Sequence, residues 1–255
     1  MEALYIAGSG LTAAERGLTV VAHNVANMQV AGFKRISAQF SELISRPAAT
    51  DGSGNAQAPL TGLGTRVADN IIEFSPGALQ PTGSPLDIAI QGDGFIEVEL
   101  PNGEYALSRG GRLEVDADGR LALASGEVIG ADIRVPEDAS ELKIETDGRV
   151  RARVGEASEY VELGQLMLSK VANPSAMRPL GNGLYMVTES SGEALAHAPS
   201  EIGGEFVQGF LEGANVDLVQ QMAQLVVAQR TYQVNARIIQ AADRLLETVN
   251  NLQRV

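Results

Sequence analysis

Few side chains in this sequence have the type and spacing that catalysis or metal binding requires. The only histidines are His23 and His197, too few for a three-histidine zinc site, and no cysteine is present to act as a thiolate or nucleophile. The runs Gly8-Ser9-Gly10 and Gly83-Ser84-Pro85 do not make the G-x-S-x-G turn of a serine hydrolase. We therefore expect no enzyme activity, no catalytic residue, no cofactor and no metal.

Two acidic or glycine-rich runs superficially resemble ligand-binding loops. Asp116-x-Asp118-Gly119 begins like a calcium loop but lacks the closing glutamate and the flanking helices, so a hairpin turn explains it better. Gly92-Asp93-Gly94 follows an apolar strand, but the next residues continue as strand and provide no helix start for a phosphate. The sequence does not exclude the paired carboxylates of a glycosidase, because such groups meet only in the folded chain. However, no Trp is present to stack on a sugar ring.

The charge is concentrated in the middle of the chain. The net charge is −13, with +1 on residues 1–46, −15 on residues 47–214 and +1 on residues 215–255. Nucleic acid is disfavoured as a partner, because its backbone attracts clustered Lys and Arg. No apolar run is long enough to span a bilayer, and the first residues lack the pattern of a signal peptide, so we expect neither membrane insertion nor a cleaved signal.

The last 41 residues predict one long helix. Residues 215–255 contain no Gly or Pro and open with Asn215, which we expect to be the N-cap. Apolar residues recur every seven positions, which predicts a coiled-coil-like seam; a long core helix of a monomer is the alternative. The seam residues are Leu218, Leu225, Tyr232, Ile239 and Leu246, with Ile238, Leu245 and Leu252 as a second row.

Residues 2–28 predict a second, weaker helix. Its heptad stripe consists of Leu4, Leu11, Leu18 and Val25. Glycines at positions 8, 10 and 17 each cost about 1 kcal/mol of helix stability relative to Ala, so this helix needs a partner, and the C-terminal helix is the obvious one.

Between the helices, a Gly- and Pro-rich segment at 47–64 precedes a region of short strands. Candidate strands lie at 71–74, 86–90, 94–100, 104–108, 111–116, 119–124, 141–145, 149–154 and 183–188. Hairpin turns are expected at the dipeptides 93–94, 102–103, 118–119, 147–148 and 182–183. The predicted fold class is α+β, with two long helices pairing around a mainly antiparallel β domain. The expected domains are 1–35 (N-terminal helix), 36–75 (connector), 76–205 (β domain) and 206–255 (connector and C-terminal helix).

Motifs in three regions of the chain resemble bacterial flagellar rod and hook proteins. They are AHNVAN (22–27) followed by GFKR (32–35), GALQPTGSPLDIAIQGDGF (77–95), and GFLEGANV (209–216) followed by QRTYQVN (229–235). The likeness covers nearly the whole chain, and the motifs occur in the family's order. Within the family, length and residues 238–243 most resemble the distal-rod branch, with the proximal-rod branch as the runner-up.

The resemblance implies a structural subunit of the flagellar rod that polymerises helically with copies of itself. It also implies contacts with proximal rod subunits, the hook protein, the L and P ring proteins and the type III export apparatus. The resemblance further implies that the protein lies in the basal body, spanning the periplasm. It implies that the terminal helices form an inner tube and that the β domain lies outside it. A coiled-coil adaptor is the alternative from another class of protein.

The expected assembly interface combines the two heptad stripes with residues of the N-terminal motif. Asn24 and Asn27 are interpreted either as polar helix-surface residues or a C-terminal helix stop before Gly32, or as hydrogen-bonding groups between subunits where the N-terminal helix turns back. Tyr232 is expected to pack on a neighbouring helix. The full predicted set is Leu4, Leu11, Leu18, Val25, Asn24, Asn27, Phe33, Leu218, Leu225, Tyr232, Ile239 and Leu246.

Overall fold

A computed structural model describes residues 2–45, 61–131, 133–155 and 159–252. The chain forms two compact units. Unit 1 is built from Met1–Ala26, Ile36–Ile71 and Asp217–Val255, and unit 2 from Asn27–Arg35 and Ile72–Val216. Each unit therefore combines segments that lie far apart in the sequence.

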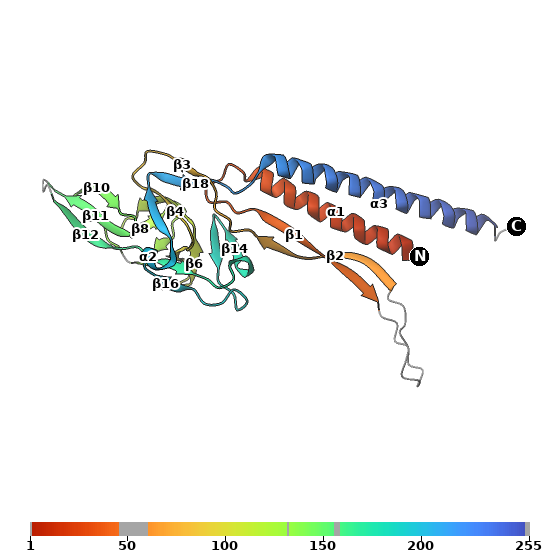
Figure 1. Ribbon diagram of the computed structural model, residues 1–255, viewed down its shortest axis with the longest axis horizontal. Helices are drawn as coiled ribbons and strands as arrows, with labels where there is room; N and C mark the ends of the chain where they lie inside the picture. The colour runs from red at the N-terminus through yellow and green to blue at the C-terminus, as the bar shows by residue number, and fades with distance from the viewer. Residues whose placement is uncertain (1, 46–60, 132, 156–158, 253–255) are drawn as a thin grey trace, which may run out of the picture. The chain divides into compact units, whose positions relative to one another are not determined.

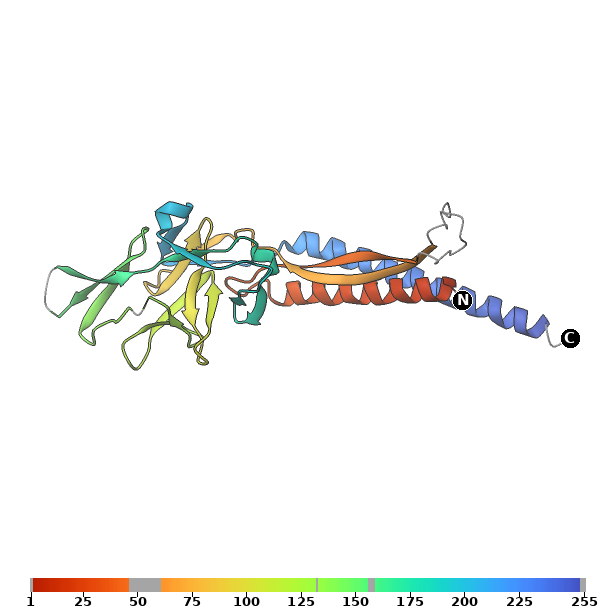
Figure 2. The same cartoon turned by 90° about the horizontal axis from the view of Figure 1, so that it is seen from below.

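Unit 1 consists of two helices and a two-stranded sheet. Its elements are α1 (Glu2–Ala26), β1 (Ile36–Ser45), β2 (Thr61–Ile72, whose last residue belongs to unit 2) and α3 (Leu218–Leu252). The helices lie side by side, β1 runs along α1, and α3 continues past the beginning of α1 (Figures 1 and 2). At about 1.5 Å per residue, α3 is roughly 50 Å long.

The start of α3 corrects one expectation. Asp217, not Asn215, caps the helix, because its carboxylate accepts hydrogen bonds from the N–H groups of Val219 at 2.8 Å and Gln220 at 3.1 Å. A carboxylate at this position also interacts favourably with the positive end of the helix. Asn215 bonds elsewhere, to a carbonyl of Glu73 and the N–H of Arg35, so its amide is not available to the helix.

Unit 2 is mainly antiparallel β structure. Its elements are β3 (Leu79–Pro81), β4 (Asp87–Gln91), β5 (Ile96–Glu99), β6 (Tyr105–Ser108), β7 (Gly110–Val115), β8 (Leu121–Leu123), β9 (Val128–Ile129), β10 (Ala139–Ile144), β11 (Arg149–Val154), β12 (Tyr160–Gln165), β13 (Leu168–Lys170), a 3₁₀ turn (Pro174–Ala176), β14 (Arg178–Gly181), β15 (Leu184–Met186), β16 (Leu195–His197), α2 (Pro199–Ile202), β17 (Glu205–Gln208) and β18 (Phe210–Glu212). The largest sheet of the described residues has the order β14-β15-β6-β5-β9-β8-β7-β4-β17. Smaller sheets are β10-β11-β12, β13-β16 and β18-β3.

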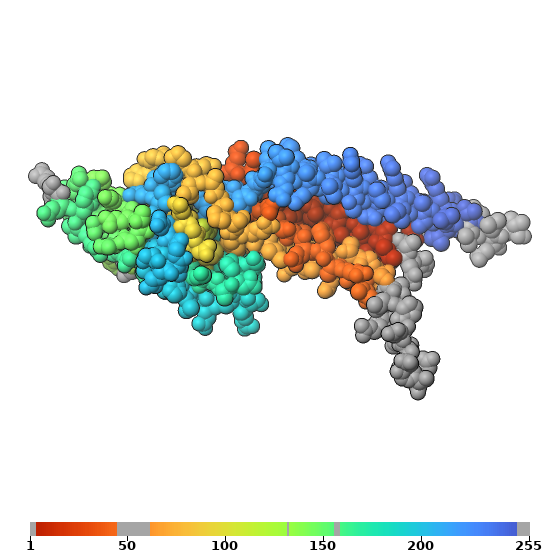
Figure 3. Space-filling model, viewed as in Figure 1, coloured from red at the N-terminus to blue at the C-terminus, as the bar shows by residue number. Residues whose placement is uncertain are grey.

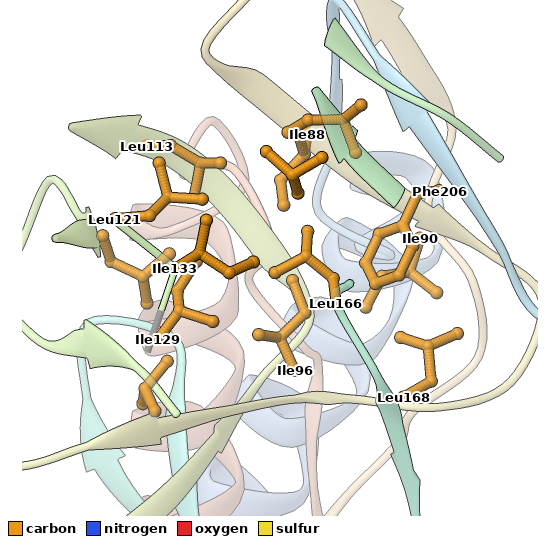
Figure 4. Close-up of a cluster of buried hydrophobic side chains, with 14 of the residues drawn as sticks. Ile88, Ile90, Ile96, Leu113, Leu121, Ile129, Ile133, Leu166, Leu168 and Phe206 are labelled. Carbon is orange, nitrogen blue, oxygen red and sulfur yellow. The ribbon is translucent and has the colours of Figure 1, made fainter. Parts of the chain in front are cut away.

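The core of unit 2 lies between these strands. Ile88, Ile96, Leu113 and Phe206 are almost completely buried and come from four different strands (Figure 4). On β5 the buried Ile96 and Val98 alternate with the more exposed Glu97 and Glu99, so one strand serves both the core and the acidic surface. The period-2 pattern of the sequence therefore assigns the faces of this strand correctly.

Most of the predicted turns are correct, and one is wrong. Asn102-Gly103, Asp118-Gly119, Asp147-Gly148 and Asn182-Gly183 each join two strands that pair with one another. Asp93-Gly94 joins β4 to β5, which pair with other strands instead. At this site a Cβ on Gly94 would come within 3.0 Å of Leu168, so the glycine serves close packing rather than a hairpin.

The α+β class is confirmed. The sequence did not predict β1, or β2 before Ile71, because the small and polar residues at 47–64 follow β1 and include the start of β2, and they resemble a linker. Of the predicted 47–64 loop, residues 47–60 lie outside the described part of the chain, and 61–64 belong to β2. The predicted domain limits remain a prediction.

Candidate assembly surfaces and a buried charged node

In unit 1, α1 and α3 pack in opposite directions along a seam of small residues. Asn24 near the end of α1 donates from Nδ2 to Oε1 of Gln221 near the start of α3 at 3.2 Å, and Gly10 lies against the side chain of Asn235. Residues of α1 on the same face recur at alternating intervals of four and three. This α1 seam comprises Ala7, Gly10, Ala14, Gly17, Val21 and Asn24.

The predicted leucine stripe of α1 lies beside this seam and not in its centre. Leu11, Leu18 and Val25 each follow a seam position by one residue, and all four residues of the stripe, Leu4 included, are half-buried. Close approach of two helices favours small side chains at their contact. Gly10, which weakens the isolated helix, provides this space: a Cβ there would lie 2.8 Å from the Asn235 amide nitrogen.

On α3, the predicted stripe and its second row have different environments. Leu218, Leu225 and Ile239 are half-buried, whereas Tyr232 and Leu246 are 36% and 45% exposed. Beside the stripe, Gln221 and Asn235 contact α1. Ala228 and Ala242 continue this row at the same seven-residue spacing. Of the predicted second row, Ile238 and Leu245 are exposed in the single chain, and the side chain of Leu252 is outside the described ones. Its place in a seam between copies remains a prediction.

The residues of the N-terminal motif make contacts within the single chain, and α1 ends at Ala26, just before Asn27. Asn24 is 1% exposed, and its amide also bonds both the N–H and the carbonyl of Ile36, at 2.9 and 2.8 Å. Asn24 therefore joins α1, β1 and α3 within one chain. Asn27 and Phe33 are half-buried in unit 2, where the Asn27 carbonyl accepts from Val30 and the Phe33 carbonyl from Asn215.

An uncharged groove of about 790 Å³ runs between α1, β1 and α3. Its floor includes small residues of α1 and α3, and no charged residue lines it in the described part of the chain. Apolar side chains of α3 are exposed along and beyond this groove, among them Val227, Val234, Ile238 and Leu245. In Figure 3 the side chains of α3 (blue) project as a row along the edge of unit 1. The described helices are not long and apolar enough to cross a bilayer.

In unit 2, Glu212 of β18 accepts hydrogen bonds from two buried cations. Its carboxylate binds Nζ of Lys34 at 2.7 Å and Nε of Arg109 at 3.2 Å, and it also accepts from the N–H of Gly77 at 2.8 Å. We call Lys34, Arg109 and Glu212 the charged node. Each of the three side chains is at most 4% exposed.

The remaining donors of the node are also satisfied. Lys34 donates to the carbonyl of Ser75 at 2.9 Å, and the Arg109 guanidinium donates to the carbonyls of Gly94, Gly92 and Ile90 at 2.6, 2.9 and 3.2 Å. Each side-chain nitrogen of Lys34 and Arg109 therefore has an acceptor, and such pairing is what makes buried charge tolerable.

Burial and pairing act on the pKa values in opposite directions. Burial lowers the pKa of Lys34 below its ordinary value, and the partial compensation comes from Glu212. Burial alone would raise the pKa of Glu212, but Arg109 and Lys34 outweigh it and lower that pKa. We therefore assign Glu212 as ionised near neutral pH, with the two cations as its counter-charges.

Comparisons with known proteins agree with the motif resemblance. Three family models match: "Flagella basal body rod protein" over residues 4–34, "Flagellar hook protein FlgE/F/G D1 domain" over 89–152 and "Flagellar basal body rod FlgEFG protein C-terminal" over 207–252. The flagellar basal-body rod protein FlgG of Borreliella burgdorferi is 35% identical, and the alignment covers all of this chain and 99% of the relative. The chain belongs to the flagellar basal-body rod protein family.

Two further relatives show that the similarity extends along the whole chain. FlgG of Agrobacterium fabrum is 34% identical over 98% of both chains. FlgF of Salmonella typhimurium is 31% identical over 98% of this chain and 97% of the relative. Members of this family are structural proteins of the basal body.

Motif residues of this rod-family chain meet at the charged node. Lys34 comes from the GFKR motif, Gly77 from the middle motif and Glu212 from the GFLEGANV motif. Asn215 of the last motif adds bonds to the carbonyls of Glu73 and Ser75. Sequence reasoning used these motifs for recognition but did not predict their contact. The available signal was Glu212 as the one charged residue of GFLEGANV, and the basic residues of GFKR as its possible partners.

Proposed function

We propose that this chain is the subunit of the distal rod, and that its copies polymerise helically into the shaft that transmits torque from the motor to the hook. The FlgG relatives align along the full chain, which supports this assignment. The FlgF relative supports the proximal rod subunit as the alternative.

The observation that carries the assembly proposal is the exposed apolar row of α3. Leu245 is 67% exposed and Val234 55%, and these residues lie on one helix face with Ile238. Exposed apolar residues in such a continuous row mark an interaction surface. We propose that this row, together with the predicted stripes of α1 and α3, packs against other copies in a coiled-coil-like arrangement.

A contact between two different patches of successive copies builds an open helical filament. The uncharged groove of unit 1 is suited to receive an apolar helix face, because no charged group would have to be desolvated there. The acidic strands of unit 2 are proposed to provide a polar surface towards the L and P rings. The same proposal includes export of the chain by the type III apparatus and its location across the periplasm. It also includes contacts with proximal rod and hook proteins.

The assembly proposal is tested by charging the exposed row. We expect Val234→Asp with Leu245→Asp to abolish motility in the native bacterium, because two carboxylates would have to be buried at each contact. Helix content by circular dichroism should stay unchanged, since both positions are exposed in the single chain. The matched control is Gln233→Asp with Gln240→Asp, two exposed polar positions of the same helix, which should retain motility. Normal hook-bearing basal bodies from the first variant would contradict the proposal.

Deletion of the gene distinguishes the two rod positions. For a distal subunit, isolated basal bodies should keep the proximal rod and lose the distal rod and hook. Loss of the proximal rod as well would favour the proximal alternative.

A further inference from the structure

The seam between α1 and α3 contains one fully buried polar pair, Asn24 and Gln221. Asn24 is 1% exposed and Gln221 is fully buried, and their side chains are joined by the 3.2 Å hydrogen bond. The Nε2 atom of Gln221 has no hydrogen-bond partner among the described residues. An incompletely paired amide of this kind costs free energy, so its presence calls for a role other than stability.

The small residues of the seam do not define one alignment. The contacts Asn24 to Gln221 and Gly10 to Asn235 are fourteen residues apart on each helix, which is two heptads. If α3 moved by seven residues in either direction, Gly10 would face Ala228 or Ala242 instead of Asn235. Both are smaller than Asn235, so either residue would fit opposite Gly10.

The polar pair distinguishes the shifted alignments from the native one. In one shifted alignment Asn24 would face Ala228, and in the other it would lie beyond the start of α3 at Leu218. In either case Gln221 would lose the partner of its Oε1 atom. Each shifted alignment therefore places one of the two amides against a small residue, Asn24 against Ala228 or Gln221 against Gly17, and burying an amide without its partner is unfavourable.

Asn24 is itself held in place, so it can act as a reference point. Its amide bonds the N–H and carbonyl of Ile36 at the start of β1. The side chain therefore cannot rotate to follow a shifted α3 without breaking these two bonds as well.

We propose that Asn24 and Gln221 form a register lock, which selects one antiparallel alignment of α1 and α3. The pair acts as a specificity-determining contact, as single polar residues do in other helix pairs. The alignment sets how far α3 extends past the start of α1, and hence where Leu245 and Leu246 are presented. This last consequence depends on the proposed function; the lock itself does not.

Disulfide trapping in the full-length monomer tests the lock, because the chain has no cysteine of its own. The native alignment is reported by Gly10→Cys with Asn235→Cys, and the shifted ones by Gly10→Cys with Ala228→Cys or with Ala242→Cys. In the otherwise unchanged chain we expect rapid cross-linking of the native pair only.

Removing the interhelical bond should release the shifted alignments. Gln221→Leu keeps the two bonds between Asn24 and Ile36, and it should raise the cross-linking rate of a shifted pair relative to the native pair by about tenfold. The swap Asn24→Gln with Gln221→Asn should restore part of the native preference. Thr19→Leu with Gln233→Leu, which makes the same kind of change at exposed positions, should leave the preference unchanged.

A Gln221→Leu chain that cross-links only through the native pair, with helix content retained, would overturn the lock. Loss of helix content would also count against it, since a register lock contributes specificity and not folding. Motility is a separate measurement. If Gln221→Leu cross-links in a shifted alignment but the cells still build normal rods, the consequence for assembly is contradicted, whereas the register lock itself is supported.

Discussion

At the scale of single residues, Glu212 holds unit 2 together. Its carboxylate forms ion pairs with two buried cations that lie far away in sequence. They are Lys34, before β1, and Arg109, between β6 and β7. Neutralising one member of such a network is expected to be more damaging than replacing the whole network by apolar residues, because it leaves buried charge without compensation.

Glu212→Gln tests this directly. The substitution keeps the shape of the side chain but leaves Lys34 and Arg109 buried without a counter-charge. We expect a loss of about 3–5 kcal/mol in the free energy of unfolding, measured with urea. Glu205→Gln, at an exposed position of β17, is the matched control and should change stability by less than about 0.5 kcal/mol. Equal effects of the two substitutions would show that the node contributes nothing.

The lowered pKa of Glu212 predicts acid sensitivity. Because its pKa is lower in the folded than in the unfolded chain, its contribution is complete above the unfolded value of about 4.3. The contribution is lost as pH falls from there through the folded pKa, where the folded carboxylate takes up its proton. The urea midpoint of the unsubstituted chain should therefore fall more between pH 6 and pH 3 than that of Glu212→Gln. Parallel pH profiles would contradict this assignment.

At the scale of elements, the seam explains why a helix rich in glycine is compatible with this fold. Gly10 allows Asn235 to approach, whereas an added Cβ on Gly8 would have nothing within 4 Å. Both residues lower helix propensity to the same degree, but only one of them makes room for α3.

The two glycines therefore predict different outcomes of the same substitution. Gly8→Ala should raise the stability of unit 1 by about 0.5–1 kcal/mol, the full propensity gain. Gly10→Ala should gain less or lose stability, because the new Cβ would displace the Asn235 amide. Thermal unfolding followed by circular dichroism at 222 nm compares the two. A larger gain from Gly10→Ala would disprove the role assigned to the seam.

At the scale of the whole molecule, the boundary between units decides which truncations are tolerated. Asn215 and Val216 belong to unit 2, and Asn215 bonds Arg35, Glu73 and Ser75 there. The helix that follows, from its cap Asp217 onwards, belongs to unit 1.

Deleting residues 217–255 should leave unit 2 folded and unable to assemble. Deleting residues 215–255 removes in addition the three hydrogen bonds of the Asn215 side chain to the backbone, so unit 2 should be less stable by about 1–3 kcal/mol. Urea unfolding of the two fragments, followed by Tyr fluorescence, measures the difference. Filaments formed by either fragment would contradict the role of α3 in assembly.

The sequence by itself determined the two helices, half of the strands of unit 2 and the family, because each depends on local signals: heptad spacing, alternation, turn dipeptides and contiguous motifs. It identified α3 to within three residues at its start but assigned the cap to Asn215, since both Asn215 and Asp217 are good capping residues and only the fold commits one of them elsewhere. It also could not separate the leucine stripe of α1 from the small-residue face beside it.

Only the tertiary structure decided which face of α1 meets α3, and that Lys34, Arg109 and Glu212 share one buried site. These relations join residues up to nearly 200 positions apart, such as Asn24 and Gln221. Burial, which turns an ordinary Asn, Lys or Glu into a specific contact, is a property of the packed chain. No spacing within one segment encodes it, because the partner is supplied by another segment.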